Sequence, residues 1–212
     1  MKLLLATHND HKRREFERLI ERSFPGGGWT LESLPDEVAL PPEDGETFAE
    51  NALGKARAAA RGTGRAAIAD DSGIAAAALG GAPGVRSARY AGEGASDEEN
   101  LAKLLREAPA GSELEYVCVI AYVDPAQGVE RLFEGSCGGS LAERPRGQRG
   151  FGYDPAFLPD DGPSGLTMAE LSDEQKDAIS HRGRALRAFA RWLGGRDAER
   201  APGDRTQAPG AE

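Results

Sequence analysis

The sequence predicts an α/β fold built on a mixed β-sheet, and two observations predict this class. Short apolar segments typical of buried strands alternate along the chain with segments whose apolar residues recur at helical spacing. Two longer strand-like segments, 114–123 and 129–141, are separated by the turn sequence DPAQG, which predicts an antiparallel hairpin. Alternating strands and helices favour parallel strand pairs and a hairpin adds an antiparallel pair, so the sheet is expected to be mixed.

The N-terminal part of the chain is expected to contain a strand, a helix and a second strand. Phe16, Leu19 and Ile20 have the spacing i, i+3, i+4, which indicates an amphipathic helix. The expected elements are a buried strand at 2–6, a polar turn with the sequence THNDHK, a helix at 12–24 ended by PGGG at 25–28, and a strand at 29–34.

A capping box opens the helix that follows the proline-rich loop LPPEDG. Thr47 and Glu50 have the spacing of this motif, and Gly62 is expected to end the helix. A short buried strand, 66–70, follows. We expect this strand to end at the acidic pair Asp70–Asp71, because adjacent like charges are unfavourable inside a strand.

The second half of the chain is punctuated by two further capping boxes. Ser96 with Glu99 opens one helix, and Ser172 with Gln175 opens a short one. Between them lie the hairpin and a long glycine-rich loop, PRGQRGFGYDPAF. The last helix follows Ser180 with Leu186, Phe189 and Leu193 on one side, and 196–212 is expected to be a disordered tail.

Composition and charge exclude several classes of protein. The chain has 212 residues and a formal net charge of −9, which argues against a general nucleic-acid binder because phosphate-backbone affinity needs a broad basic face. No segment approaches the length of a membrane span, and the N-terminus has no signal-peptide pattern. Cys118 and Cys137 lack metal-ligand spacing and are expected to be free buried thiols, so the expected location is the cytoplasm.

The acidic pair is the first segment that indicates chemistry. Two successive carboxylates after a buried strand repel each other unless a cation lies between them and the substrate. Mg²⁺ is commonly bound by one or two carboxylates together with waters and phosphate oxygens. One aspartate of the pair could therefore coordinate Mg²⁺ while polarising a water, and Glu43 of LPPEDG is a candidate for the second carboxylate. A purely structural turn at Asp70–Asp71 is the alternative.

The turn THNDHK is the second such segment. A strand that leads through a turn into a helix presents free backbone N–H groups, and Lys12 adds a full positive charge there. This predicts a phosphate site, although the P-loop pattern is absent and an ordinary helix start with a solvated lysine is the alternative. His8 and His11 lie in a turn that does not hold metal-ligand spacing.

Two C-terminal segments complete the expected site. In RGFGYDP, Phe151 and Tyr153 could form a shelf for a stacked nucleobase, with Asp154 as an acceptor; aromatics that fill the core are the alternative. Ser180 is expected to cap a helix whose first turn carries His181 and Arg182. Cations at this helix end oppose the helix dipole, so an anion or a carbonyl-rich ligand is expected nearby.

Together these segments resemble the Ham1 family of inosine triphosphate pyrophosphatases, enzymes that remove deaminated purine nucleotides. The resemblance reaches about Gly195 and rests on motifs that occur in the family's order: ATHNDHK, GETFAENALGKA, ADDSG, LGGAPGVRSARYAG, GFGYDP and ISHRGRAL. It implies a long mixed sheet flanked by helices, with two lobes and a cleft in one domain at 1–195. It also implies Mg²⁺-dependent hydrolysis of ITP, dITP and XTP to the monophosphate and pyrophosphate, and a homodimer.

The resemblance also implies roles for individual residues. Asp71 would be the catalytic acid that orients or deprotonates water and binds metal, with Glu43 as the other metal ligand and Asp70 nearby. Residues implied to contact the substrate are Thr7, His8, Asn9, Asp10, His11, Lys12 and Lys55 at the phosphates, Ser72 and Arg89, and Phe151, Gly152, Tyr153, Asp154, Lys176, His181 and Arg182 at the base.

One position departs from the family's pattern. Many relatives have glycine just before the lysine of the first motif, where this chain has His11. A side chain there could narrow the approach to the phosphates or supply an extra donor.

Two other functions stay open: a Maf-type pyrophosphatase that acts on other modified nucleotides, and a nucleotide-binding regulator without catalysis.

Overall fold

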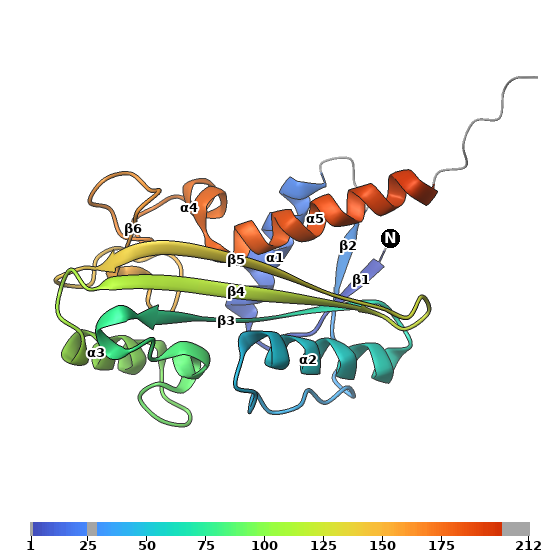
Figure 1. Ribbon diagram of the computed structural model, residues 1–212, viewed down its shortest axis with the longest axis horizontal. Helices are drawn as coiled ribbons and strands as arrows, with labels where there is room; N and C mark the ends of the chain where they lie inside the picture. The colour runs from blue at the N-terminus through green and yellow to red at the C-terminus, as the bar shows by residue number, and fades with distance from the viewer. Residues whose placement is uncertain (1, 25–28, 201–212) are drawn as a thin grey trace, which may run out of the picture.

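A computed structural model of the chain describes residues 2–24 and 29–200, which form a mixed sheet flanked by helices (Figure 1). The elements in chain order are β1 (Lys2–Leu5), α1 (Asp10–Ser23), β2 (Thr30–Ser33), α2 (Phe48–Thr63), β3 (Ala67–Ala76), η1 (Ala77–Leu79), η2 (Gly84–Arg89), α3 (Asp97–Glu107), β4 (Glu113–Asp124), β5 (Val129–Leu141), η3 (Asp154–Ala156), β6 (Phe157–Pro159), α4 (Asp173–Ile179) and α5 (His181–Arg200).

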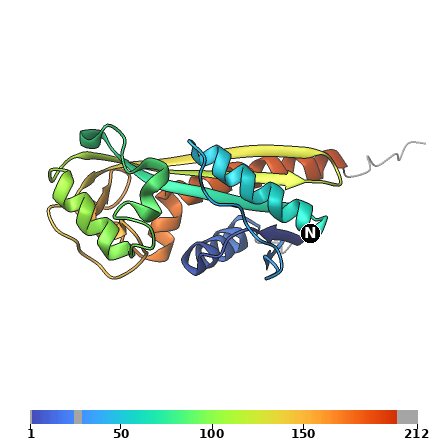
Figure 2. The same cartoon turned by 90° about the horizontal axis from the view of Figure 1, so that it is seen from below.

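The six strands have the order β2-β1-β3-β4-β5-β6. β1 is parallel to both of its neighbours, whereas β3, β4, β5 and β6 pair antiparallel to one another. The predicted α/β class with a mixed sheet is therefore confirmed, as is the hairpin. β3, β4 and β5 run through the length of the molecule, with α1, α2 and β1 towards one end and α3 and β6 towards the other (Figures 1 and 2).

Helices cover both faces of the sheet at the end that carries β1. α2 packs on one face through alanines, Ala52, Ala56 and Ala59, which lie against Ala67 and Ala69 of β3 and against β4. α1 and α5 pack on the other face, where Phe16, Leu186 and Phe189 share a core with Ile68 and Ile120. Successive residues of β3 thus face α2 and then α5 in turn, as strand geometry requires.

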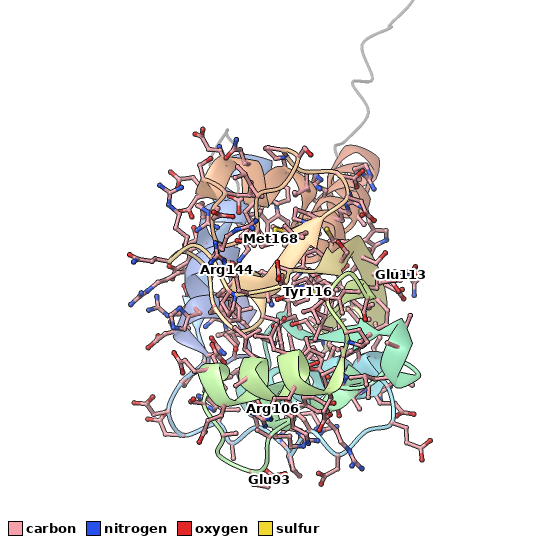
Figure 3. The ribbon with its side chains drawn as sticks, turned by 90° about the vertical axis from the view of Figure 1, so that its left-hand side faces the viewer. Glu93, Arg106, Glu113, Tyr116, Arg144 and Met168 are labelled. Atoms are coloured by element: carbon pink, nitrogen blue, oxygen red, sulfur yellow. The ribbon has the colours of Figure 1, made fainter. Side chains whose placement is uncertain are left out.

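A third core fills the opposite end of the molecule, around α3, β6 and the far halves of β3, β4 and β5. Figure 3 looks onto this end: the labelled Tyr116 and Met168 belong to the core, and Glu93 lies on an outer loop. Among the helices of the described residues, none combines the length and apolarity that a membrane span requires.

Several predicted boundaries are corrected by the structure. β3 does not end at the acidic pair but continues to Ala76. α2 runs past Gly62 to Thr63, and the left-handed residue that caps it is Gly64, with φ of 66°. The glycine-rich loop leads into the short strand β6, which the sequence analysis missed. α5 extends to Arg200, so it includes the first residues of the segment 196–212 that was expected to be a tail. Residues 25–28, expected to end the first helix, and the rest of that segment, 201–212, lie outside the described residues.

Candidate active site

The acidic pair lies in the middle of β3, where we expected no charged residues. The pairing of Asp70 with Ile120 and of Asp71 with Val119 belongs to an uninterrupted antiparallel ladder, so the two side chains point to opposite faces. Asp70 faces α1 and α5, and Asp71 faces α2, as their different hydrogen-bond partners show. The sheet separates the two carboxylates and reduces their mutual repulsion.

Asp71 is held by two donors and has an elevated pKa. Its Oδ2 accepts from Nδ2 of Asn51 on α2 at 2.9 Å, and its Oδ1 accepts from the backbone N–H of Ser72 at 3.0 Å. Burial is the main cause that raises the pKa of Asp71, and the neighbouring Glu43 adds to it, while Lys55 and Lys12 oppose both. A carboxyl group with a raised pKa is suited to general-base chemistry.

Asp70 has the opposite electrostatic character. Burial alone would raise its pKa, but Lys12, Arg182 and Lys55 outweigh burial and hold the pKa below the ordinary value. Its Oδ2 lies 3.0 Å from Nζ of Lys12 and 3.4 Å from Nη2 of Arg182. Asp70 is therefore an ionised counter-charge that joins α1 to α5. The environments of Asp70 and Asp71 shift their pKa values in opposite directions, which indicates different roles for the two carboxyl groups.

A groove of about 500 Å³, lined by both basic and acidic side chains, lies beside the acidic pair. Lys55 of α2 is buried and forms an ion pair with Glu43, while Arg89 of η2 donates to the backbone oxygen of Glu43 at 2.6 Å. Burial lowers the pKa of Lys55, but Asp70, Glu43 and Asp71 outweigh it, so the ammonium stays charged. The groove is lined by Thr7, His8, Asn9, Lys12, Leu40, Pro41, Pro42, Glu43, Asp44, Lys55, Ala88, Arg89 and Glu93.

The start of α1 places Lys12 between the carboxylate of Asp70 and the groove. Asn9 is the N-cap, and its side chain accepts from the backbone N–H of Lys12 at 3.0 Å. Thr7 accepts in turn from the backbone N–H of Asn9 at 3.2 Å. Asp10 lines neither this groove nor the inner cavity described next, and it is exposed and paired with Arg13 at 3.1 Å.

A smaller inner cavity of about 100 Å³ shares Asn9, Lys12 and Glu43 with the groove. Asp71 and Ser72 border it, and Phe151, Gly152, Tyr153, Asp154, Lys176, His181 and Arg182 of the predicted base site all line it. The structure thus gathers residues from the chain's two ends around one cavity. Phe151 is half-buried there, as a stacking surface requires.

Tyr153 and Asp154 also support the loop that carries Phe151. Tyr153 belongs to the core, and its hydroxyl donates to the backbone oxygen of Ser87 at 2.7 Å, as the alternative interpretation expected. Asp154 Oδ2 accepts from the backbone N–H of Phe151 at 3.0 Å and from Nζ of Lys176 at 2.7 Å. Its Oδ1 accepts from the hydroxyl of Tyr116 at 3.2 Å. Both carboxylate oxygens of Asp154 thus accept hydrogen bonds from other groups of the protein.

Buried anions offset the cations at the start of α5. Glu15 of α1 forms ion pairs with Arg182 and, at 2.5 Å, with Lys176. Burial raises the pKa of Glu15, but Arg182 and Lys176 outweigh it and lower the pKa to about 2. Glu15 and Asp70 thus neutralise the unfavourable charges that the sequence analysis noted. Ser180 caps α5 as predicted, because its Oγ accepts from the N–H of Gly183 at 3.1 Å.

His181 is a neutral, buried wall of the inner cavity. Its ring stacks on Tyr116 with centroids 4.5 Å apart and an interplanar angle of 5°. Burial, with Arg182 next to it, lowers the pKa of His181 well below the ordinary value. Its Nδ1 and the Nε of Arg182 are buried without a hydrogen-bond partner among the described residues. Buried polar atoms of this kind favour a ligand with complementary groups.

The donor set at the groove fits a cation that arrives with a phosphate ligand. No group of three or more His, Cys, Asp or Glu side chains within 2–24 and 29–200 is arranged to hold a metal ion. Asp71 and Glu43 are close enough for the charge of Glu43 to raise the pKa of Asp71. Mg²⁺ commonly takes only one or two carboxylates and completes its shell with waters and phosphate oxygens. Asp71 and Glu43 together with the lysines of the groove meet that requirement.

The sequence model of the Ham1 family matches residues 3–192. The chain belongs to the Ham1 family. It is 49% identical to the dITP/XTP pyrophosphatase of Frankia alni, and the match covers 91% of this chain and 97% of that protein. It is 47% identical to the dITP/XTP pyrophosphatase of Geobacter sulfurreducens, and that match covers 91% of this chain and 96% of that protein. The solved structure of a HAM1 protein from Coxiella burnetii superposes with a TM-score of 0.81 at 37% identity, covering 92% of this chain and 99% of that one.

Several residues of this Ham1 site escaped the sequence analysis. Glu15 lies three residues after Lys12 on the buried side of α1, and a charged residue on an otherwise apolar helix face was a signal that could have identified it. Asn51 of α2 and Tyr116 of β4 gave no such signal, since their roles depend on contacts with distant segments. Asp97 accepts from the backbone N–H of Gly152 at 2.8 Å and ties α3 to the Phe151 loop.

Proposed function

We propose that this chain hydrolyses ITP, dITP and XTP to the nucleoside monophosphate and pyrophosphate. The relatives of Frankia alni and Geobacter sulfurreducens carry the name dITP/XTP pyrophosphatase. The observation that carries the proposal in this chain is the pair of cavities. A narrow cavity with an aromatic wall, buried donors and Asp71 meets a wider groove that holds Lys12, Lys55 and Arg89.

The base enters the inner cavity and stacks on Phe151, which is worth roughly 1–3 kcal/mol per base. Arg182 and Lys176 line the same cavity, and the unpartnered Nε–H of Arg182 is a donor for the 6-keto oxygen of hypoxanthine or xanthine. Adenine has an amino group at that position, which would leave two donors facing each other. Mispaired buried groups reduce catalytic efficiency by several powers of ten.

The triphosphate occupies the groove, where Lys12, Lys55 and the start of α1 neutralise its charge. Asp71 orients a water and accepts its proton as the water attacks the α-phosphorus. Pyrophosphate leaves with its negative charge held by the two lysines. Catalysis of this type depends mostly on positioning and electrostatic stabilisation.

The proposed cofactor is Mg²⁺, which Glu43 and Asp71 would hold. When bound, Mg²⁺ supplies charge neutralisation at the phosphates and polarises the attacking water. Oδ2 of Asp70 pairs with Lys12 and Arg182, so the part proposed for Asp70 is to keep these cations in place. This assignment divides the acidic pair into one reactive and one structural carboxylate.

We further propose a cytoplasmic homodimer that acts on free nucleotides. Cys118 and Cys137 are free buried thiols, as predicted, which agrees with a reducing compartment. The net charge of −9 disfavours nucleic acid as a partner. Light scattering after size exclusion tests the dimer, and a mass of one chain at micromolar concentration would contradict it.

A substrate panel tests the proposed function. Pyrophosphate release is measured from ITP, dITP, XTP, ATP, GTP and dTTP, with Mg²⁺ and with EDTA. The expected result is Mg²⁺-dependent release from ITP, dITP and XTP that greatly exceeds release from ATP and dTTP. Asp71→Asn is the inactive control for contaminating phosphatases. Release from none of the nucleotides, or equal release from all of them, would overturn the proposal.

A further inference from the structure

His11 departs from the family's pattern and has an aromatic partner. It is the second residue of α1, directly before Lys12, and its side chain is exposed. Its imidazole stacks on the ring of Phe151, with centroids 5.3 Å apart and an interplanar angle of 24°. This contact joins the helix start that carries Lys12 to the loop that carries the expected base shelf.

Phe151 separates two spaces, and His11 lies in only one of them. The ring borders the inner cavity and also an outer hollow of about 120 Å³. The outer hollow is lined by His11, Arg14, Glu15, Arg18, Gly150, Phe151, Asp173 and Lys176. His11 is absent from the lining of the inner cavity. The imidazole therefore contacts Phe151 from the outer hollow, whereas Arg182, which lines the inner cavity and not the outer hollow, lies over the ring from the inner side.

The backbone of the Phe151 loop is anchored more firmly than the ring. The N–H of Phe151 donates to Asp154 at 3.0 Å, and the next N–H, of Gly152, donates to Asp97 at 2.8 Å. These bonds place the backbone, and the position of the ring depends on the side chains that contact it. Nζ of Lys176 and Cζ of Arg182 lie 5.3 and 5.6 Å from its centroid. His11 is thus a ring contact that lies on the side away from the inner cavity.

We propose that His11 is a positioning residue for base binding, which stacks on Phe151 and holds the ring against the inner cavity. A bound purine then forms the third layer of the stack His11–Phe151–base. The inference rests on the proposed function, because it assigns the base to that cavity. An aromatic pair contributes beyond the burial of its area, and ordering of the ring before binding saves entropy.

The variants separate stacking from other roles of His11. His11→Ala removes the ring, and His11→Phe restores a ring without the imidazole nitrogens. Arg14→Ala is the matched control, because Arg14 lines the same outer hollow and is exposed on the same helix. Each variant is characterised by KM and kcat for ITP and by the Kd of IMP from titration calorimetry.

His11→Ala is expected to raise KM for ITP and Kd for IMP by about 3- to 10-fold with little change in kcat, which is the range of an aromatic pair. His11→Phe restores both constants, and Arg14→Ala leaves them unchanged. In a Phe151→Leu background His11→Ala has no further effect, because the partner of the stack is gone.

Three results would overturn the inference: unchanged KM and Kd in His11→Ala, failure of His11→Phe to restore them, or an undiminished effect in the Phe151→Leu background. The last two would assign His11 a direct contact with phosphate. Failure of the unmodified chain to release pyrophosphate from any nucleotide would instead overturn the proposed function. The two failures are therefore distinguishable in the same set of measurements.

Discussion

Asp70 and Asp71 are adjacent in the chain, but their carboxylates lie on opposite faces of β3 and have oppositely shifted pKa values. Lys12 and Arg182 keep Asp70 ionised, whereas burial raises the pKa of Asp71. The alternation of a strand thus converts a repulsive pair into two groups with separate tasks. This relationship makes the two aspartates experimentally separable.

Asp71→Asn is expected to reduce kcat for ITP by about 10²–10⁴-fold, the usual contribution of a general base. The amide keeps the shape of the side chain, so the Kd of IMP should change little. Pyrophosphate release and calorimetric titration measure the two quantities. Asp36→Asn, an exposed aspartate outside both cavities, is the control. Near-normal turnover in Asp71→Asn would remove this residue from the catalytic step.

Asp70→Asn is expected to act mainly on stability. Loss of the carboxylate leaves the half-buried Lys12 and the buried Arg182 short of counter-charge, and breaking a buried pair costs about 3–5 kcal/mol. Urea unfolding at pH 7 followed by circular dichroism gives the free energy of unfolding. Asp71→Asn serves as the comparison and should lose much less. Equal free energies of unfolding in the two variants would contradict the assignment of different roles.

Glu15 predicts an acid-sensitive contribution to stability. Its pKa in the folded chain is about 2, below the ordinary 4.5, because Arg182 and Lys176 outweigh burial. The stabilisation is complete above the unfolded pKa and is lost as pH falls from about 4.5 towards 2. A lowering of this size corresponds to about 3 kcal/mol. The difference in the free energy of unfolding between the unmodified chain and Glu15→Gln should therefore shrink as pH falls over this range. A difference that stays constant with pH would argue against the ion pairs.

Phe151→Ala is expected to raise KM for ITP by about 5- to 100-fold, because base stacking on an aromatic ring is worth roughly 1–3 kcal/mol. The chemical step is remote from the ring, so kcat should change less. Leu166→Ala is the control, since Leu166 is exposed and borders neither cavity. A fall in kcat at unchanged KM would show that Phe151 does not stack on the base.

Removal of divalent metal is expected to abolish pyrophosphate release, and added Mg²⁺ to restore it. Glu43→Gln should raise the Mg²⁺ concentration needed for half-maximal activity, because one of the two carboxylates beside the groove loses its charge. Circular dichroism before and after EDTA treatment checks that the fold is retained. Full activity in EDTA would exclude the metal from the reaction.

Local signals in the sequence predicted much of the fold correctly. The capping boxes at Thr47, Ser96 and Ser172 are all present, because each depends only on residues within one helical turn. The hairpin of β4 and β5 was predicted for the same reason. β6 was missed because its three residues pair only with distant residues of β5.

The interior of the site depended on long-range contacts. β3 was expected to end at the acidic pair because local patterns do not reveal that Lys12 and Arg182 lie beside Asp70. Glu15 was missed for a related reason, since its partners lie on α4 and α5. His11 was noted as a departure, but only the fold showed that it stacks on Phe151.

Local patterns along the chain were enough to predict the class of fold, the starts of the three helices with capping boxes and the set of polar residues available for a nucleotide site, because periodicity and capping act over a few residues. The tertiary structure alone decided which face of β3 each aspartate occupies, which cations accompany it and which carboxyl group has a raised pKa. Burial and charge proximity are properties of packed segments. They arise only when α1, α2 and α5 close on the sheet.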